Sequence, residues 1–350
     1  MSKRVNRKKQ SLLIIGTCLL LVTSVFAFFV YSRVFKPNLN LADKELPYLF
    51  IPTGSDFDDV VSILENRRLL NNQNSFRWLA KRMHYDEIVR PGKYKLKSKM
   101  NNKDLVSLLR SGIQEPVKLT FNTIRLKDEL AQKVAEQIEA PSSSIINLLE
   151  DEDYVAVLGF SSENALCMFI PNTYEFYWNT SADQFLRRMK KEYDKFWNET
   201  RLQQAAGIGL TPTEVSILAS IVQKETNFND EKRVVAGVYL NRLKKNMKLE
   251  ADPTLVFALG NFSVNRVLSV YKEIDSPYNT YMYSGLPPGP ICLPEISSLK
   301  AVLDYAKHNY LYFCAKDDFS GRHSFAASYN QHLVNARRFQ RALDNRGIKS

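Results

Sequence analysis

The sequence predicts an α+β protein with a single N-terminal transmembrane helix, a small module and a larger domain of mixed helices and strands. Three observations point to this class. A long uncharged run stands near the N-terminus, short alternating segments typical of strands follow, and segments with apolar residues at helical spacing lie between them. We expect a cytoplasmic tail at 1–10, the transmembrane helix at 11–32, a linker at 33–46, the small module at 47–116 and the larger domain at 117–347.

The run from Ser11 to Tyr31 contains no charged residue. About 20 residues at roughly 1.5 Å per residue cover the hydrocarbon core of a bilayer, so this run can span a membrane as one helix. A cleaved signal peptide is the alternative, but the run is long for one and no small-x-small cleavage site follows it. More basic residues precede the run than follow it, which predicts a single-pass protein of the cytoplasmic membrane with a cytoplasmic N-terminus and an extracytoplasmic remainder.

The formal net charge of +11 does not indicate nucleic-acid binding. Seven basic residues and no acidic one lie within the first 36 residues, so the remainder carries only +4. Of the four cysteines, Cys18 lies in the predicted span, and Cys167, Cys292 and Cys314 are widely spaced without a metal-ligand pattern. We expect small buried thiols, although two of them could pair.

The module at 47–116 reads as strand, helix, helix, strand, helix. Its first strand runs into a turn at Pro52 and Gly54, and Asp56 or Ser55 can cap the helix that follows. A second helix is expected at 75–81, a strand at 90–96, and a helix at 102–110 closed by Gly112. The module offers no cluster of acidic, His or Cys side chains, which favours binding or spacing over catalysis.

The larger domain begins with a strand at 117–121 and helices at 125–138, 142–150 and 182–197. Between them, the segment from Phe169 to Trp178 is rich in aromatic residues. Such residues either fill a core or offer flat faces to sugar rings. We expect core positions for most of them and regard Tyr174 as the best candidate for a cleft.

A helix beginning at Thr211 carries the residue of greatest chemical interest. Thr211 with Glu214 forms a capping box, and Pro212 fits the first helical position. Glu225 shares a helix face with apolar residues, whereas Ser216 and Ser220 take the other side. A carboxyl group held against apolar side chains has a raised pKa and can act as a general acid near neutral pH. Alternatively, Glu225 simply extends past the last helical turn into solvent.

Further polar residues follow along the chain. Asp230 is expected to cap a helix that contains Asn241, and an Asn inside a helix usually bonds to something. Asp252 before Pro253 fits the N-cap of a helix at 254–259. This structural role and a catalytic role are alternative interpretations of Asp252. Dense Pro and Gly at 276–281 and 284–294 predict shaped loops, where ligands are often held. A helix at 297–306, strands at 310–315 and 323–325, and a last helix at 330–344 complete the prediction.

An ordered set of short motifs resembles the YceG-like family of endolytic murein transglycosylases. The motifs are ASIVQKET (219–226), YLNRL (239–243), ADPT (251–254), SPYNTY (276–281), GLPPGPI (285–291), SLKA (298–301), YLYF (310–313) and G-x-H-x-F (321–325). The resemblance extends to IPTG (51–54) and RPGKY (90–94) of the small module, which it implies is LysM-like. The resemblance implies that the domain at 117–347 is catalytic.

Three departures from the family pattern stand out. Gln223 replaces the first acid of the common V-E-K-E-T, which leaves Glu225 as the match to the catalytic position. Glu250 adds a carboxylate where an amide is usual, so the role of that position is open. Asn172 replaces the acid of the common F-P-D-T-Y, and the E-G that usually precedes this motif is absent.

The resemblance implies non-hydrolytic cleavage of the β-1,4 bond between N-acetylmuramic acid (MurNAc) and N-acetylglucosamine (GlcNAc), leaving 1,6-anhydro-MurNAc ends and trimming or terminating nascent strands. Glu225 would be the catalytic acid and base, and Glu250 a possible second carboxylate. Seven further residues would orient the sugars, and each has a purely structural role as its alternative. They are Asn241, Asp252, Asn279, Thr280, Tyr281, His323 and Tyr174. Peptidoglycan strands and peptidoglycan synthases are the expected partners, and no metal or cofactor is implied. Two alternatives stay open: a non-catalytic membrane-anchored peptidoglycan-binding scaffold, and a muramidase-type hydrolase in which Glu250 or Asp252 activates water.

Overall fold

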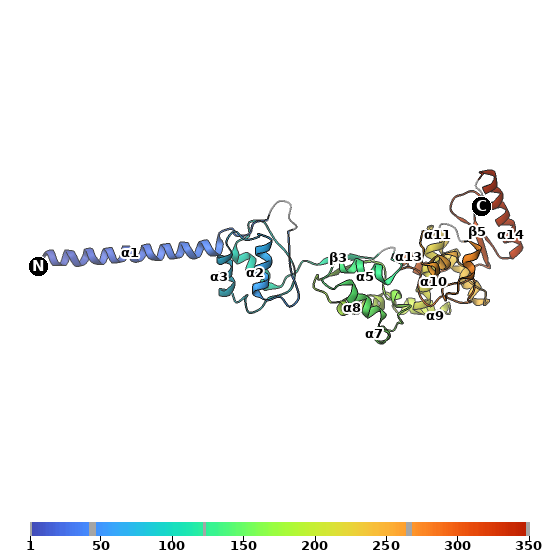
Figure 1. Cartoon of the computed structure of the whole chain (residues 1–350), viewed down its shortest axis with the longest axis horizontal. Helices are drawn as coiled ribbons and strands as arrows, with labels where there is room; N and C mark the ends of the chain where they lie inside the picture. The colour runs from blue at the N-terminus through green and yellow to red at the C-terminus, as the bar shows by residue number, and fades with distance from the viewer. Residues whose placement is uncertain (1, 42–46, 122–123, 264–267, 348–350) are drawn as a thin grey trace. The chain divides into compact units, whose positions relative to one another are not determined.

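The computed structural model describes residues 2–41, 47–121, 124–263 and 268–347 (Figure 1). The chain forms two compact units, unit 1 with Met1–Val117 and Glu175–Asn179, and unit 2 with Lys118–Tyr174 and Thr180–Ser350. The helices are α1 (Ser2–Phe35), α2 (Phe57–Asn66), α3 (Gln73–Arg82), α4 (Asn102–Ser111), α5 (Lys127–Ala135), α6 (Ser142–Glu150), α7 (Glu152–Val157), α8 (Ala182–Phe196), α9 (Glu199–Gly207), α10 (Pro212–Glu225), α11 (Asn229–Lys244), α12 (Asp252–Leu259), α13 (Ile296–Leu303) and α14 (Tyr329–Asn345). The strands are β1 (Tyr48–Ile51), β2 (Gly92–Lys95), β3 (Val117–Thr120), β4 (Thr173–Phe176), β5 (Tyr312–Ala315) and β6 (His323–Ala326), and short 3₁₀ turns lie at Ala165–Met168 and Ser269–Glu273.

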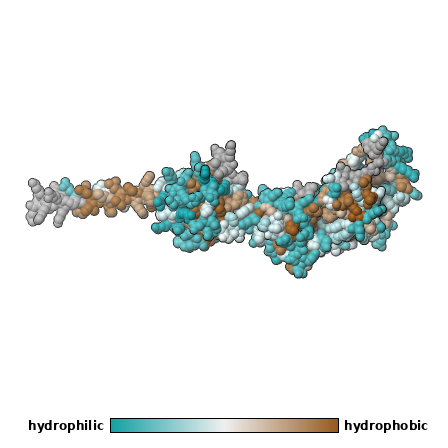
Figure 2. All heavy atoms as spheres, in the orientation of Figure 1, coloured by the Kyte–Doolittle hydropathy of each residue, from teal (hydrophilic) through white to brown (hydrophobic). Residues whose placement is uncertain are grey.

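The structure is a mixture of helices and strands, as predicted, and begins with one long apolar helix. The part of α1 from Leu12 to Phe35 is long and apolar enough to cross a membrane, with a mean hydropathy of 2.6. Apolar side chains follow one another along this part of α1 (Figure 2). The residues predicted as a tail, from Ser2 onward, continue the same helix.

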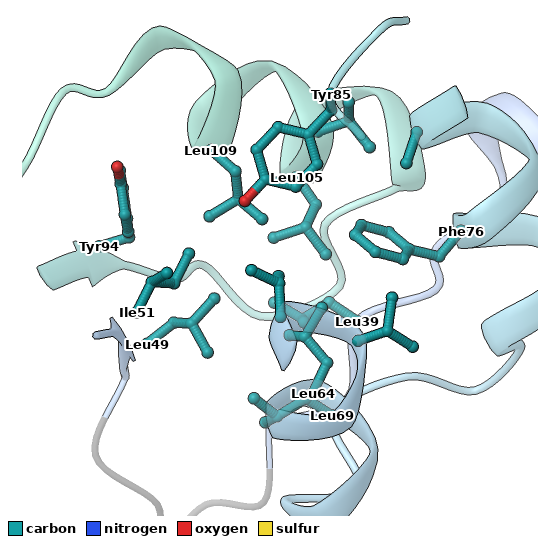
Figure 3. Packing of buried hydrophobic residues seen from close by; sticks show 14 of the residues in the cluster. Leu39, Leu49, Ile51, Leu64, Leu69, Phe76, Tyr85, Tyr94, Leu105 and Leu109 are labelled. Carbon is teal, nitrogen blue, oxygen red and sulfur yellow. The ribbon is translucent and has the colours of Figure 1, made fainter. Parts of the chain in front are cut away.

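Unit 1 packs three helices against a two-stranded antiparallel sheet. In this sheet Leu49 of β1 lies opposite Tyr94 of β2, and both side chains are fully buried. Figure 3 shows them with Phe76 of α3 and with Leu39, which comes from the predicted linker. Leu39 forms an isolated bridge with Leu70, so this part of the chain belongs to the module's core. Residues 42–46 of the predicted linker lie outside the described residues.

The helix ends of unit 1 follow the local signals in the sequence. Asp56 forms a capping box at the start of α2. Its side chain accepts from the backbone N–H of Asp59, and the side chain of Asp59 accepts from the backbone N–H of Asp56. At the end of α4, Gly112 adopts a left-handed conformation with φ of 69°, which favours glycine. Both predicted boundaries are confirmed.

The first part of unit 2 has an aromatic core. Phe121, Phe169 and Phe185 are buried, with ring centroids about 6 Å apart. Tyr174 of β4 joins this core, and its hydroxyl donates to the backbone carbonyl of Ile170 at 2.6 Å. The short helices α7 and α9 were not predicted from the sequence.

Helix α10 is the centre of the second part of unit 2, where it packs against α11, α12 and α13. The predicted capping box of Thr211 and Glu214 is present, with Pro212 in the first turn. The prediction of an amphipathic helix is wrong, because every residue from Val215 to Val222 is buried. Ser220 is fully buried, and its hydroxyl donates to Ile217 and accepts from the backbone N–H of Ile291.

The Pro- and Gly-rich segment at 284–294 packs against α10. From Gly289 to Pro294 it is buried, and the Cys292 thiol contacts the backbone carbonyl of Ser220. A Cβ at Gly289 would meet the carbonyl oxygen of Glu163 at 2.1 Å, so a side chain does not fit there. This segment supports the helix core. The four cysteines are unpaired.

The last part of unit 2 is the antiparallel pair β5 and β6 with α14 packed against both strands. Phe313 lies opposite Phe325 in this sheet. The strands and the last helix were predicted, with ends that differ by one or two residues.

Candidate active site

A cleft of about 420 Å³ in unit 2 brings the end of α10 together with α11, the start of α12, β5, β6 and α14. Its lining is largely aromatic and ionisable. It comprises Glu225, Tyr239, Arg242, Leu249, Glu250, Asp252, Tyr281, Tyr312, Phe313, Cys314, Ala315, His323, Tyr329 and His332. Five of the residues predicted from the sequence are therefore in one place: Glu225, Glu250, Asp252, Tyr281 and His323.

Glu225 is the last residue of α10, and its side chain turns into the cleft. The residue keeps some solvent exposure, but its carboxyl group is enclosed by the cleft walls. Burial raises the pKa of this group from an ordinary 4.5 to about 7. A hydrogen bond from Tyr239 acts in the opposite direction, the negative charge of Asp252 raises the pKa, and the positive charge of Arg242 lowers it. A carboxyl group with this pKa can hold and release a proton near neutral pH.

Helix α11 supplies two further side chains, which were not among the predicted site residues. The hydroxyl of Tyr239, which is almost fully buried, donates to Oε1 of Glu225 at 2.5 Å. Three residues further along the same helix face, Arg242 is buried and donates to the carbonyls of Lys248, Leu249 and Leu311. Both residues belong to the motif YLNRL, so the resemblance already pointed to this segment. Their roles were not predictable from it, because the groups that they bind lie elsewhere in the chain.

Two more carboxylates face the cleft, and each has its own partner. Glu250 accepts from Arg242 at 2.8 Å, in an uncommon left-handed backbone conformation with φ of 49°. Asp252 accepts from the hydroxyl of Tyr281 at 2.6 Å. The prediction that Asp252 caps α12 is wrong, since Ala251 occupies the cap and Asp252 is the first helical residue. Its carboxylate is thereby left facing the cleft.

The opposite wall is built from aromatic rings on β5 and α14. The ring of Tyr312 stacks on His332 with centroids 5.4 Å apart, and Tyr329 lies beside both. Nδ1 of His332 is buried and has no hydrogen-bond partner among the described residues. Burial and the charge of Arg242 lower the pKa of His332, which favours the neutral imidazole. Tyr329 and His332 were not predicted as site residues, because they lie on the last helix, outside all the motifs that indicate a site.

His323 of β6 enters the cleft from the side of α11. Its Nδ1 lies 3.1 Å from Oε2 of Glu231, and its backbone N–H donates to the other oxygen of that carboxylate. Glu231 is buried and also accepts from the hydroxyl of Thr226, the residue after Glu225. His323 and Glu231 thus connect β6 to the junction between α10 and α11. The predicted cap at Asp230 is wrong, because Asp230 lies inside α11 and pairs with Arg322.

Four predicted site residues do not line the cleft. Asn241 donates to the carbonyls of His308 and Tyr310, and Asn279 donates to those of Lys272 and Ile274. Thr280 is buried; it accepts from the N–H of Ala251 and bonds the hydroxyl of Thr254, which holds the segment next to Asp252. Tyr174 lies in the aromatic core described above.

Gln223, the departure from the family pattern two residues before Glu225, caps a neighbouring helix. Its Oε1 accepts from the N–H of Glu295 at 2.5 Å and from the hydroxyl of Ser298 at 3.1 Å, at the start of α13. A second cleft, of about 510 Å³, lies on the opposite face of α11. Its one acidic side chain, Asp304, is paired with Arg233, so it offers no free carboxyl group for acid catalysis.

Several known proteins are similar to this chain. The YceG-like family matches residues 49–338. The chain belongs to this family. Over 320 residues this YceG-like chain is 27% identical to the endolytic murein transglycosylase of Bacillus subtilis, covering 87% of the chain and 88% of that relative. It is 25% identical over 349 residues to the endolytic murein transglycosylase of Streptococcus pneumoniae. This match covers 89% of the chain but only 62% of that longer relative.

A solved structure is also similar. The crystal structure of a YceG-like protein from Listeria monocytogenes matches this YceG-like chain with a TM-score of 0.55 and 29% identity. The match covers 82% of the chain and 97% of the Listeria protein. The family fold therefore extends over most of both units.

Proposed function

We propose that this YceG-like chain is a membrane-anchored endolytic lytic transglycosylase of peptidoglycan. It cleaves the bond between C1 of MurNAc and O4 of GlcNAc and leaves 1,6-anhydro-MurNAc ends, which trims or terminates nascent glycan strands. The observation that carries this proposal is Glu225, whose enclosed carboxyl group has a pKa of about 7 and lies in an aromatic cleft. The names of the relatives from Bacillus and Streptococcus support the same reaction.

The first step is proton transfer to the leaving oxygen. Protonated Glu225 donates to the glycosidic oxygen as the C1–O bond breaks, and the bonding electrons go to the GlcNAc oxygen. Positive charge develops on the MurNAc ring. The carboxylate of Asp252 favours this charge, while Tyr281 holds Asp252 in place. The Tyr239 hydroxyl stabilises the Glu225 carboxylate that is left behind.

The second step closes the anhydro ring without water. The C6 hydroxyl of the same MurNAc attacks C1, and Glu225 takes the proton of that hydroxyl, which restores its starting state. One acid is enough because the substrate provides its own nucleophile, whereas a hydrolase uses a second carboxylate for water or for a covalent intermediate. Glu250 is less suited to activate water because Arg242 holds its carboxylate.

The walls of the cleft suit a sugar chain. Tyr329 is exposed and offers a ring face to the apolar face of a pyranose ring, while Tyr312 and His332 stack beside it and form the wall of the cleft. Asn241, Asn279 and Thr280 act indirectly in this proposal, because their side chains hold the backbone around the cleft.

Product analysis tests the reaction. The full chain in detergent is incubated with purified glycan strands in ¹⁸O-labelled water, and the new ends are identified by mass spectrometry. Unlabelled anhydro ends are expected. Reducing ends that carry the label would identify a hydrolase with Asp252 or Glu250 as base, and absence of cleavage would favour a binding scaffold. Glu225→Gln should abolish cleavage, whereas Glu214→Gln, in the capping box of the same helix, should not.

The location of the protein belongs to the same proposal. Residues Leu12–Phe35 form a single anchor in the cytoplasmic membrane, with the N-terminus in the cytoplasm and both units outside, near peptidoglycan synthases. The order β1, α2, α3, β2 with an antiparallel strand pair supports a LysM-like module in unit 1. Protease added to intact spheroplasts should degrade both units and leave an N-terminal fragment that is protected by the membrane. Complete protection of the chain from the protease would mean that both units lie in the cytoplasm and would contradict the proposed orientation.

A further inference from the structure

The end of α1 is fastened to the module of unit 1 by buried amide groups. The side-chain N–H₂ of Asn102 donates to the backbone carbonyl of Arg33 at 2.8 Å and to the hydroxyl of Ser75 at 2.9 Å. Its oxygen accepts from Asn38 at 2.7 Å, and both amides are almost fully buried. The carbonyl of Arg33 is one of those that a helix end leaves without an intrahelical partner. A satisfied buried network of this kind holds its members in one arrangement, so α1 and the module form one rigid piece.

The same contacts define how near the module lies to a membrane that α1 crosses. Leu12–Phe35 contains 24 residues, which at about 1.5 Å each extend beyond a hydrocarbon core of about 30 Å. The last turn of α1, with Arg33, therefore lies at the level of the lipid headgroups. The ring of Trp78 on α3 lies 5.7 Å from the guanidinium of Arg33. Trp78 is consequently at headgroup level as well.

Basic side chains surround this position. Helix α3 carries Arg77, Lys81 and Arg82 and no acidic residue, and the guanidinium of Arg82 lies 5.7 Å from the Trp78 ring. On α4, the ammonium group of Lys103 lies 5.4 Å from the ring of Phe35 at the end of α1. Asp58 pairs with Arg77, but no described ion pair involves Arg82 or Lys103.

We infer that the face of the module formed by Trp78, Arg82 and Lys103 rests on the membrane and binds anionic phospholipid headgroups. This inference depends on the proposed anchoring by α1. Tryptophan is amphipathic and favours the membrane interface, and exposed Arg and Lys attract anionic headgroups. The face is continuous with the proposed anchor, and its charge is complementary to such lipids. Unit 1 therefore has a fixed orientation on the bilayer instead of hanging from a flexible tether.

Tryptophan fluorescence tests this orientation. The full chain is reconstituted into nanodiscs of phosphatidylcholine and phosphatidylglycerol that contain a lipid with a nitroxide quencher on its headgroup. We expect quenching that is lost in Trp78→Phe and retained in Trp178→Phe, the matched control in the same unit. Equal quenching in the wild type and in Trp78→Phe would overturn the inference.

A charge test identifies the headgroup. In the wild type, adding phosphatidylglycerol to phosphatidylcholine should increase the quenching of Trp78, and the double variant Arg82→Glu, Lys103→Glu should lose this increase. The control Lys95→Glu, on β2, should keep it. An increase that survives in the double variant would overturn the assignment to anionic headgroups.

A flotation experiment separates the inference from the anchor. Chain that floats with alkali-washed vesicles while Trp78 stays unquenched would overturn the inference and leave the anchor intact. Chain that does not float would overturn both. Neither result bears on cleavage of free glycan strands, which is measured separately by the anhydro ends.

Discussion

The environment of Glu225 determines the pH range in which the cleft can donate a proton. Its pKa of about 7 predicts that cleavage falls as the pH rises above about 7, because the acid is then ionised before substrate arrives. Tyr239 lowers this pKa by its hydrogen bond to the carboxylate. Tyr239→Phe should therefore move the basic limb of the activity profile to higher pH.

The same variant should also reduce the maximal rate. A hydrogen bond to a charged group contributes about 1.5–3 kcal/mol, so we expect a loss of roughly 10- to 100-fold. Release of anhydro ends is measured between about pH 5 and about pH 9, where the profile of kcat/KM reports the pKa of the free enzyme and kcat gives the loss in maximal rate. If Tyr239 only packs against Phe313, the phenylalanine variant should retain the wild-type profile.

Removal of the charge of Asp252 should shift the pH profile of activity in the opposite direction. Its negative charge raises the pKa of Glu225, so Asp252→Asn should move the basic limb to lower pH. Loss of a carboxylate that favours the developing positive charge should also reduce kcat by roughly 10- to 1000-fold. Tyr281→Phe keeps the charge of Asp252 and serves as the control for that charge: its basic limb should stay at the pH of the wild-type limb, although kcat falls because Asp252 loses the hydrogen bond that holds it. A limb that shifts equally in both variants would contradict the electrostatic role.

At the scale of elements, Arg242 links α11 to the segment at 248–250 and to the residue before β5. Its guanidinium is buried and binds three backbone carbonyls, which would be left without a donor in Arg242→Met. The contact with the carbonyl of Leu249 is buried, and those with Lys248 and Leu311 are partly buried. A buried carbonyl without a partner costs about 1–3 kcal/mol and a partly buried one less, so we expect the free energy of unfolding of unit 2 to fall by about 2–3 kcal/mol. Urea unfolding of the purified chain measures this change.

Arg233 on the opposite face of α11 provides a matched control. Its side chain is half exposed and pairs with Asp304, so Arg233→Met should cost no more than about 1 kcal/mol. Similar losses in both variants would mean that helix propensity or net charge, and not the buried contacts of Arg242, accounts for the effect.

Local elements could be predicted from the sequence because their signals are local. The capping box of α10, the capping box of α2 and the glycine at the end of α4 are each encoded within four residues. The partners of Glu225 were not predictable from local signals, because Tyr239 acts from another helix and His332 from the last one. Asp252 shows the ambiguity directly: Asp before Pro fits a helix cap, and only the tertiary contact with Tyr281 shows where its carboxylate points.

At the scale of the whole molecule, the segment between α1 and β1 is part of the module's core. Leu39 is 2% exposed and packs in the cluster with Leu49, Leu64 and Phe76, and Asn38 bonds the backbone of Asn72. A soluble form should therefore begin at Pro37 and not at Pro47, although both remove α1.

The two truncations give a direct comparison. Removal of a buried leucine typically costs about 2–5 kcal/mol, so the form that begins at Pro47 should show faster amide hydrogen exchange in β1 and β2 than the form that begins at Pro37. Amide exchange in α10 and α11 of unit 2, and cleavage of free glycan strands, should be the same in both forms. Equal protection of β1 and β2 in the two truncations would show that Leu39 and Asn38 contribute little. Loss of cleavage only in the shorter form would show that the catalytic unit needs an intact module, because the two forms differ only in ten residues of unit 1 (37–46).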